Sequence, residues 1–396
     1  MKSSETIVWI CGAAAVVLSF FGLLATLDWK RNEKMTLHIG TYGEHIYRYS
    51  FDKKSLEFSL AGKAEARNAS YVLPAADAVY AVSECGEESG AYSFGHGLMG
   101  MASFRQQTGA DPCFLLALDG YLLTADYSGG SISIFPASAG SLGDICQSLS
   151  FTGNGPVEGR QESSHIHQLK VIPGFEGKWI LATDLGADKI RILLITSGEQ
   201  DTVKHISDVD CPSGSGPRHM EFSKDGKTLY CICELSGEVL AYSIDSENST
   251  PALTLMQRIQ ADEVNAGGSA DIHLHPSGDY LYTSHRLDND GIAIFRTMPD
   301  GRLEKTGYAR TGRHPRNFCI SPDGSLLFAA CRDDRIIQVF NTKVVDDLIQ
   351  QSADTIHNAI FADDFQRNTF QFCSICKCFT DFLRKNFEGY FFMGHM

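Results

Sequence analysis

Short runs of alternating apolar and polar residues repeat along most of the chain, each followed by a turn and a second such run. A β-rich run typically ends in a polar residue, turn residues follow, and the alternation then resumes. This period-two pattern, broken by turn residues, predicts β-hairpins. Seven such units occur: LHIGTYGEHIYRYSF (37–51), VYAVSECGEESGAYSF (79–94), LLTADYSGGSISIF (122–135), WILATDLGADKIRILLI (179–195), LYCICELSGEVLAYSI (229–244), LYTSHRLDNDGIAIF (281–295) and LFAACRDDRIIQVF (327–340).

The spacing of these units predicts the fold class. Measured at the polar residue that ends the first run, they recur at intervals of about 42 to 58 residues, with little amphipathic helix between them. A strand-built repeat of this length predicts an all-β, seven-bladed β-propeller in which each unit supplies the two middle strands of a four-stranded blade. A large β-sandwich or two stacked barrels is the alternative, but neither requires seven similar hairpins.

The pattern changes at the start of the chain. Residues 7–27 are almost wholly apolar and long enough to cross a bilayer as a helix. The N-terminal part, 1–34, is therefore either a membrane anchor or an extension ahead of a start at Met35. Basic residues are more numerous after the apolar stretch than before it, which places the main domain in the cytoplasm, anchored or not. The propeller is expected over 35–345.

The pattern also changes after the last hairpin. Residues 346–396 form a divergent tail, and Lys343 to Asp364 is polar and typical of a helix, so no closing strand for the ring is predicted. The CSIC sequence at 373–376 resembles half of a zinc site. A second matching pair is missing, so we expect no metal.

Composition narrows the range of partners. The 396 residues are 43% hydrophobic and 21% charged, as in globular proteins. The formal charge of −14 argues against a nucleic-acid partner, and an anionic small molecule would need a local cluster of arginine or lysine. The twelve cysteines are scattered rather than closely spaced, which is typical of reduced thiols in a cytosolic protein. No cofactor is predicted.

Polar groups that could carry chemistry fall at strand ends and in the adjoining loops, where a rigid sheet scaffold commonly presents a site. In GSGPRHMEFSKDGKTLYCICEL (214–235), Arg218, His219 and Glu234 lie at the outer ends of one hairpin, although Arg218 and Glu234 could equally form an ordinary structural ion pair. Further candidates occupy comparable positions in other units or loops: Glu84, Asp126, Asp184, Arg160, His165, His167, Arg286 and Arg316.

The types of these residues suggest what the site would bind. Arginine forks match carboxylate or phosphate groups, so Arg218, Arg286 and Arg316 would give a positive patch in an acidic protein. His165 and His167 are two apart and fall on one side of an extended segment, as expected of a pair that exchanges protons. The GSGP sequence is not a dinucleotide fingerprint, and no G-x-S-x-G elbow is present.

Together these motifs resemble the seven-bladed propeller lactonases, which include propeller-type 6-phosphogluconolactonase and the fungal carboxymuconate-lactonizing enzyme. The resemblance runs from about Met35 to Phe340. It is carried by NASYVL (68–73), YAVSE (80–84), ADYSGGSISIF (125–135), RQ…HIHQ (160–168), DLGADKI (184–190), GSGPRHMEFS (214–223), CEL (233–235), HPSGDYLYTSHR (275–286) and HPRNFCISPDG (314–324).

The resemblance implies roles for particular residues. The family's H-x-H histidine corresponds to His165 or His167, and its remaining catalytic residues correspond to Arg218, Glu234 and Arg286. Where the family has asparagine in S-N-R, this chain has His285. We expect substrate contacts from Arg160, His219, Glu84, Asp184 and Arg316.

The implied reaction is hydrolysis of a sugar-acid lactone, with 6-phosphogluconolactone of the pentose phosphate pathway as the expected substrate. An arginine would stabilise the carbonyl oxygen, and Glu234 or a histidine would take a proton from water. Two alternatives remain: a cycloisomerase that closes a muconate to a lactone, and a non-catalytic propeller that serves as a binding scaffold.

Overall fold

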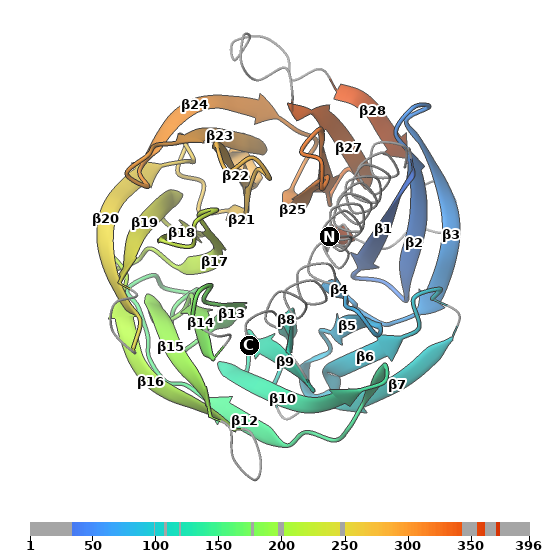
Figure 1. The fold of residues 1–396 in the computed structure, drawn as a ribbon, viewed down its shortest axis with the longest axis horizontal. Coiled ribbons are helices and arrows are strands. Elements are labelled where there is room, and N and C mark those ends of the chain that lie inside the picture. Colours follow the sequence, from blue (N-terminus) through green and yellow to red (C-terminus); the bar gives the residue numbers. More distant parts are fainter. Residues whose placement is uncertain are drawn as a thin grey trace, which may run out of the picture.

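A computed structural model describes residues 34–98, 100–106, 109–118, 120–175, 178–196, 202–245, 250–342, 355–360 and 370–372. Within these residues the strands form seven antiparallel sheets, arranged as the blades of a ring (Figure 1). The prediction of an all-β, seven-bladed propeller is confirmed.

The blades are numbered here in the order in which the ring is followed from β1. Blade 1 contains β29 (Phe370–Phe372), β1 (Lys34–Thr41), β2 (His45–Asp52) and β3 (Glu57–Glu65). Blade 2 contains β4 (Val72–Pro74), β5 (Val79–Ser83), β6 (Gly90–Phe94) and β7 (Met101–Gln106). Blade 3 contains β8 (Pro112–Leu118), β9 (Tyr121–Asp126), β10 (Ser131–Ser138), β11 (Ser141–Leu142) and β12 (Gln147–Ser150).

The remaining blades follow the same plan, with four strands each. Blade 4 contains β13 (Ile166–Val171), β14 (Trp179–Asp184), β15 (Lys189–Thr196) and β16 (Thr202–Asp210). Blade 5 contains β17 (Pro217–Phe222), β18 (Thr228–Cys233), β19 (Glu238–Asp245) and β20 (Ala252–Gln260). Blade 6 contains β21 (Ser269–Leu274), β22 (Tyr280–His285), β23 (Gly291–Thr297) and β24 (Leu303–Arg310). Blade 7 contains β25 (Pro315–Ile320), β26 (Leu326–Cys331), β27 (Ile336–Asn341) and β28 (Thr355–Ile360).

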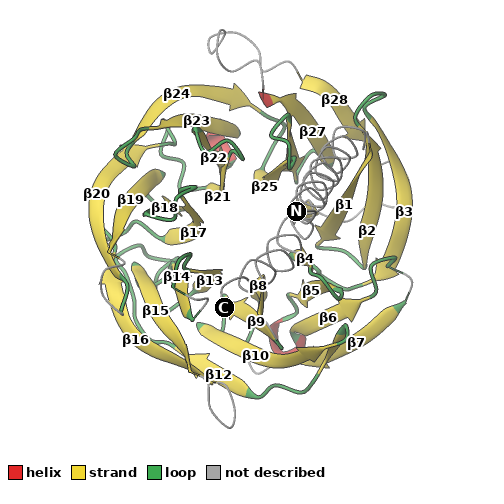
Figure 2. Ribbon diagram, in the orientation of Figure 1, coloured by secondary structure: helices red, strands yellow, loops and turns green. Residues whose placement is uncertain are grey.

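Each predicted hairpin supplies the two middle strands of its blade, as expected. The strand before each hairpin is the innermost one, so β8, β13, β17, β21 and β25 surround the centre of the ring while β3, β7, β16, β20 and β24 form its rim (Figure 1). Two short helical turns, η1 (Gly86–Glu88) and η2 (Leu287–Asn289), lie between strands in the described part of the chain (Figure 2). A predicted site residue, Glu84 or Arg286, lies between the preceding strand and each of these turns.

Aromatic and aliphatic side chains fill the space between neighbouring blades. Successive side chains of a strand point to opposite faces of its sheet, so each blade contributes to two interfaces. Between blades 1 and 7, for example, the rings of Phe51 and Phe328 meet edge to face, with centroids 5.1 Å apart. Between blades 2 and 3, Tyr71 lies against Phe114 at 4.4 Å. This packing gives a rigid frame that can hold side chains from distant parts of the chain in fixed positions.

The end of the chain differs from expectation. A helix was expected over 343–364, but residues 355–360 form β28, which pairs with β27. A closing strand was not predicted, yet β29 pairs with β1 and becomes the innermost strand of blade 1. Pairing with an existing sheet edge overrides local helical preference in this segment, because it satisfies backbone groups that would otherwise be exposed at the edge.

The apolar segment 7–27 lies outside the described residues, as do Cys373 and Cys376. No helix in the described part of the chain has the length and apolar character needed to cross a membrane.

Candidate active site

Polar residues from several blades meet at one mouth of the ring. Within a blade, the inner strand begins where the next strand ends, because the two strands are antiparallel. Glu84, Glu234 and Arg286 directly follow β5, β18 and β22. Arg218 and Arg316 are the second residues of the inner strands β17 and β25. Residues far apart in the sequence therefore share one end of the propeller.

A β-bulge at the start of the inner strand selects which side chain is offered there. In blades 3, 4, 5 and 7, the strand register shifts at the second residue, which is Cys113, His167, Arg218 or Arg316. A bulge inserts an extra residue and re-aims its side chain, and bulges are common beside active sites. Three of the four bulges follow a proline, which has no N–H to donate to the sheet. The Pro-Arg and Pro-Cys pairs are thus the local signal for this geometry.

Glu234 is the centre of an arginine cluster. Its Oε2 accepts a hydrogen bond from Nε of Arg218 at 2.7 Å. Its Oε1 accepts one from Nη2 of Arg160 at 2.6 Å and lies 3.2 Å from Nη2 of Arg286. Arg160 comes from the loop between blades 3 and 4, and Arg218 and Arg286 come from blades 5 and 6. The structure thus brings four of the predicted site residues together. The ion pair between Arg218 and Glu234 is therefore not confined to one hairpin, because Glu234 also pairs with Arg160 and Arg286.

The electrostatics of this cluster favour an anionic ligand. Burial alone would raise the pKa of Glu234, but Arg286, Arg218 and Arg160 outweigh it and hold that pKa far below its usual range. Burial lowers the pKa of Arg286 to about 9, although Glu234 opposes the shift. At neutral pH the three arginines and one glutamate carry a net charge of 3 − 1 = +2. This positive charge stands in a protein of net charge −14.

Arg218 has one donor left over. Its side chain is fully buried, with Nε on Glu234 and Nη1 on the carbonyl oxygen of Ala270 at 2.7 Å. Its Nη2 has no hydrogen-bond partner within the described structure. A buried donor without a partner is costly, and such groups are found where a ligand supplies the missing acceptor.

The two histidines of the H-x-H motif occupy different environments. The ring of His165 is half-buried and stacks on Tyr127, with centroids 4.4 Å apart and planes 7° apart. Its Nδ1 lies 2.9 Å from the carbonyl oxygen of Tyr127, so this nitrogen must be the donor, and a neutral ring then carries its lone pair on Nε2. His167 is buried beside Cys113 and His219, and burial with the nearby Arg218 keeps its pKa well below the usual value.

His219 is held by an aspartate that the sequence did not single out. Asp271, on the inner strand of blade 6, accepts a hydrogen bond from Nδ1 of His219 at 2.7 Å. It also accepts from Nε2 of His273 at 3.1 Å and from Nδ2 of Asn317. Burial and Arg218 lower the pKa of His219 to about 4, so the imidazole is neutral at physiological pH. Asp271 therefore ties three inner strands together beneath the arginine cluster.

Glu84 and Arg316 approach the same mouth from blades 2 and 7. Ser70 donates a hydrogen bond to Oε1 of Glu84, and Arg316 lies over the ring of Tyr42 at 5.8 Å. Burial lowers the pKa of Arg316, but Tyr42, Glu84 and Glu234 together raise it above its usual value. The charges of two carboxylates, Glu84 after β5 of blade 2 and Glu234 after β18 of blade 5, thus both act on Arg316.

Three residues singled out in the sequence form contacts within their own blades. Asp184 is fully buried and pairs with Arg191 in its own blade, 2.7 Å from Nη2. His285, which replaces the family's asparagine, is buried between the hydroxyl groups of Ser269 and Thr283, each 2.8 Å from a ring nitrogen. The histidine that replaces the family's asparagine at position 285 is therefore accommodated by hydrogen bonds within blade 6. Asp126 likewise accepts hydrogen bonds from the hydroxyls of three neighbours in blade 3.

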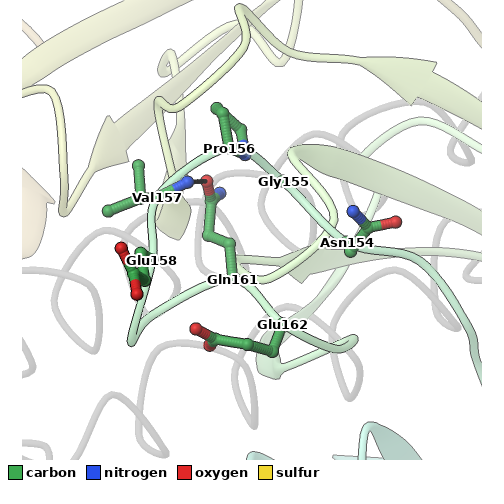
Figure 3. A pocket seen from close by; sticks show the side chains of 7 residues that line it. All are labelled: Asn154, Gly155, Pro156, Val157, Glu158, Gln161 and Glu162. Carbon is green, nitrogen blue, oxygen red and sulfur yellow. Dashed lines mark hydrogen bonds between the residues drawn. The ribbon is translucent and has the colours of Figure 1, made fainter.

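A long loop between blades 3 and 4 delivers Arg160. A cavity of about 320 Å³ lies within this loop and is lined by residues of 154–162 (Figure 3). Gln161 turns into the loop and accepts a hydrogen bond from the backbone N–H of Val157 (Figure 3). Its Nε2 donates to Asp188 at 2.8 Å, and the same carboxylate accepts the backbone N–H groups of Gly214 and Gly216. One aspartate thus clamps both the loop of Arg160 and the loop that leads to Arg218.

Metal ligation finds no support in the part of the chain that the structure describes, where no three His, Cys, Asp or Glu side chains are grouped for it. The cysteines described there are all free thiols. Sequence reasoning missed Tyr127, Asp188 and Asp271, because aspartates and tyrosines at strand ends are too common to be singled out without their neighbours.

The curated proteins similar to this chain include several that are named 6-phosphogluconolactonase. A Formosa agariphila protein named 6-phosphogluconolactonase is 33% identical over 230 residues, which are 57% of this chain and 64% of that protein. The match thus spans just under two thirds of that relative. A Bacillus subtilis protein of the same name is 28% identical over 312 residues, which are 74% of this chain and 87% of the relative.

Two solved structures are similar to most of this chain. A Bacteroides uniformis protein provisionally assigned as a 6-phosphogluconolactonase is 38% identical, with a TM-score of 0.76 over 83% of this chain and 97% of its own. A periplasmic gluconolactonase of Pseudomonas aeruginosa is 27% identical, with a TM-score of 0.73 over 87% of this chain and 100% of its own. The sequence profile described as "Lactonase, 7-bladed beta-propeller" matches residues 36–358. The chain therefore belongs to the seven-bladed β-propeller lactonase family.

Proposed function

We propose that the protein hydrolyses the ester bond of a sugar-acid lactone, and that 6-phosphogluconolactone is its substrate. The observation that carries this proposal is the arginine cluster on Glu234, which gives a net positive charge at the mouth of the ring in an acidic protein. Arginine forks recognise phosphate and carboxylate oxygens, which the substrate and its product both offer. Two relatives are named 6-phosphogluconolactonase, which supports the same substrate class.

The site residues suggest a division of roles. The unpartnered Nη2 of Arg218 is suited to stabilise the carbonyl oxygen as water attacks, because it is a buried donor already fixed in place. Nε2 of His165 is suited to accept the proton of that water, since its other nitrogen is held by Tyr127. Arg160 and Arg286 remain to hold the phosphate group at the far end of the substrate.

Glu234 is a poor candidate for the base in this scheme. Its pKa is depressed by three arginines, and a carboxylate that holds its charge so strongly gains little by accepting a proton. Its suitable role is to orient the arginines. This assigns proton abstraction to His165 rather than to Glu234.

The test compares the full chain with Arg218→Met and with a matched control, Arg258→Met. Arg258 also pairs with a glutamate in blade 5, but at an exposed position on the rim. Hydrolysis of 6-phosphogluconolactone would be followed by proton release, with the fast spontaneous reaction subtracted. We expect Arg218→Met to lower kcat by roughly 10²- to 10³-fold, as for the loss of an oxyanion donor, and the control to retain activity.

Absence of turnover above the spontaneous rate would rule out the proposed substrate. Turnover of a carboxymuconate in place of the phosphorylated lactone would replace hydrolysis with cycloisomerisation, for which the same arginines could hold carboxylates. If neither compound reacts, the result would favour the third alternative, a non-catalytic propeller that serves as a binding scaffold.

A further inference from the structure

The ring of Tyr127 has no part in the scheme above, although it lies at the site. Tyr127 directly follows β9 of blade 3, as Glu234 follows β18 and Arg286 follows β22. Its ring stacks on the imidazole of His165, with centroids 4.4 Å apart and planes 7° apart. Its carbonyl oxygen accepts the hydrogen of Nδ1 in the same imidazole at 2.9 Å. One residue therefore holds both a face and a nitrogen of the proposed base.

The backbone around this stack is closely packed. The carbonyl oxygen of Tyr127 also accepts the N–H of Gly130 at 3.3 Å, which closes a turn. Gly130 has a φ of +56°, and a Cβ there would lie 2.6 Å from the carbonyl oxygen of Ser164, so only glycine lets the turn approach this segment. A Cβ at Gly186 would lie 2.8 Å from Cδ2 of His165. The imidazole thus lies against Gly186 as well as Tyr127, which limits rotation of its ring.

Ring contacts connect the stacked pair to the arginine cluster. The ring of Tyr127 meets that of His167 edge to face, with centroids 5.6 Å apart. The ring of His167 meets that of His219 in the same way at 5.0 Å. Nε2 of His219 lies 3.5 Å from Nη1 of Arg218. The proposed base and the proposed oxyanion donor are therefore joined through a continuous row of side chains.

The charged groups next to the stack come from two elements. Arg160, a member of the arginine cluster and part of the loop that leads to His165, forms a side-chain hydrogen bond to Tyr127. Asp184, at the end of β14, accepts the backbone N–H of His165 at 2.9 Å, but its charge is balanced by Arg191 at 2.7 Å. Of these neighbours, the face of Tyr127 is the one suited to stabilise a positive charge on the imidazole.

We propose that Tyr127 is a positioning residue that aims Nε2 of His165 at the attacking water and stabilises the imidazolium that forms. The inference rests on the proposed lactone hydrolysis. As an O–H bond of water breaks, the water oxygen bonds to the carbonyl carbon, an electron pair moves onto the carbonyl oxygen, and the proton passes to Nε2. When the carbonyl double bond forms again, the bond from its carbon to the ring oxygen breaks. The ring oxygen then takes the proton from Nε2, which restores the neutral imidazole.

The activity test compares Tyr127→Leu with Tyr127→Phe. Tyr127→Leu removes the stacked ring, so kcat should fall roughly 10- to 100-fold. Because a positive imidazole is then less favoured, the acidic limb of the pH profile of kcat should move to lower pH, which a merely structural loss would not cause. Tyr127→Phe keeps the ring and loses only the hydroxyl contact with Arg160. Its kcat and acidic limb should therefore match the wild type, while its KM rises.

Phe151→Leu is the matched control. Phe151 is half-buried and meets the ring of His205 edge to face at 5.5 Å, on the rim strand β16. The substitution removes an aromatic contact to a histidine away from the site, so kcat and its pH profile should be those of the wild type. An unchanged kcat and acidic limb in Tyr127→Leu would overturn the inference, as would equal losses of kcat in Tyr127→Leu and Tyr127→Phe.

A measurement without substrate separates this inference from the proposed function. The ¹⁵N NMR shifts of the His165 imidazole in the full chain, assigned by their loss in His165→Gln, report which nitrogen carries the proton. We expect the Nδ1–H form in the wild type and in Tyr127→Phe, and a mixture of both forms in Tyr127→Leu. The Nε2–H form in the wild type would overturn the inference whatever the enzyme hydrolyses. A wild type in the Nδ1–H form that does not turn over the lactone would instead overturn the proposed function.

Discussion

Glu234 is a residue whose environment decides its role. Its type and its place at a strand end suit a general base, and the sequence allowed that role. In the structure both oxygens face arginine donors, from three different segments of the chain. A carboxylate in this position stabilises the approach of three positive side chains that would otherwise repel each other. It serves the site by holding charge rather than by exchanging protons.

This role predicts the behaviour of Glu234→Gln. The substitution removes the one negative charge among three buried or half-buried arginines, so unfolding free energy should fall by about 3 kcal/mol, and KM should rise as the arginines separate. Chemical denaturation and steady-state kinetics measure both effects. Glu238→Gln, which removes the rim partner of Arg258, should cost less than about 1 kcal/mol. A variant of normal stability that loses only the acidic limb of its pH–rate profile would instead identify Glu234 as the base.

At the scale of the elements, the site depends on how loops and strand starts are fixed. Each inner strand of blades 3, 4, 5 and 7 is bulged at its second residue, and this places one side chain from each blade at the mouth, including those of Arg218 and Arg316. The loops before β13 and β17 lack such support from a sheet. Asp188 replaces it by accepting hydrogen bonds from Gln161, Gly214 and Gly216, at 2.6 to 2.8 Å.

Asp188→Asn tests this coupling. An amide presents one oxygen in place of two and turns its NH₂ group toward a backbone donor, so both loops should loosen. We expect kcat/KM to fall roughly tenfold, mainly through KM, with a loss of about 1 to 2 kcal/mol in unfolding free energy. Asp126→Asn is the matched control, because Asp126 accepts from hydroxyl groups that can rotate to meet an amide. Equal KM effects from both variants would show that Asp188 has no special part in positioning the arginines.

At the scale of the whole molecule, the inner strands are joined by charged side chains as well as by apolar packing. Asp271 of blade 6 bonds His219 of blade 5 and Asn317 of blade 7. His273 lies between Asp271 and Glu221, and Glu221 pairs with Lys170 of blade 4 at 2.5 Å. This network crosses four blades, so the protonation of its members affects the stability of the ring.

The network predicts a stability maximum near neutral pH. The pKa of Asp271 is lowered, since His273 and His219 outweigh burial, so its contribution is present above about pH 4 and is lost as pH falls. Although burial opposes the shift, Asp271 and Glu221 raise the pKa of His273 to about 9; its contribution is complete below about pH 6.5 and is lost as pH rises through 9.

Thermal unfolding between pH 3 and 10 measures this. The Tm of the wild type should fall on both sides of a plateau, whereas Asp271→Asn should have a lower Tm at pH 7 and a smaller fall between pH 8 and 10. Asp288→Asn, at an exposed position in η2, should follow the wild-type profile. An alkaline fall of the same size in Asp271→Asn would show that the His273 pair does not govern it.

The local pattern by itself determined the fold class of this protein. Hairpin periodicity depends only on neighbouring residues, so seven units could be recognised and were found as the middle strands of seven blades. The GPRH and CEL sequences also singled out Arg218 and Glu234, and the ion pair between them that the sequence left open is present in the structure. The closing strand β29 could not be found in this way, since its pairing with β1 joins the two ends of the chain and leaves no local signal.

Only the tertiary structure decided what the polar residues do. Asp184 and Glu84 look alike in the sequence, as acidic residues at the ends of second strands. Asp184 is neutralised by Arg191 in its own blade, whereas Glu84 accepts a hydrogen bond from Ser70 and is influenced by the charge of Arg316 from blade 7. His165 and His167 are likewise equivalent until Tyr127 anchors one ring and burial encloses the other. Burial and charge are set by neighbours that are distant in sequence, and those neighbours are known only once the ring has closed.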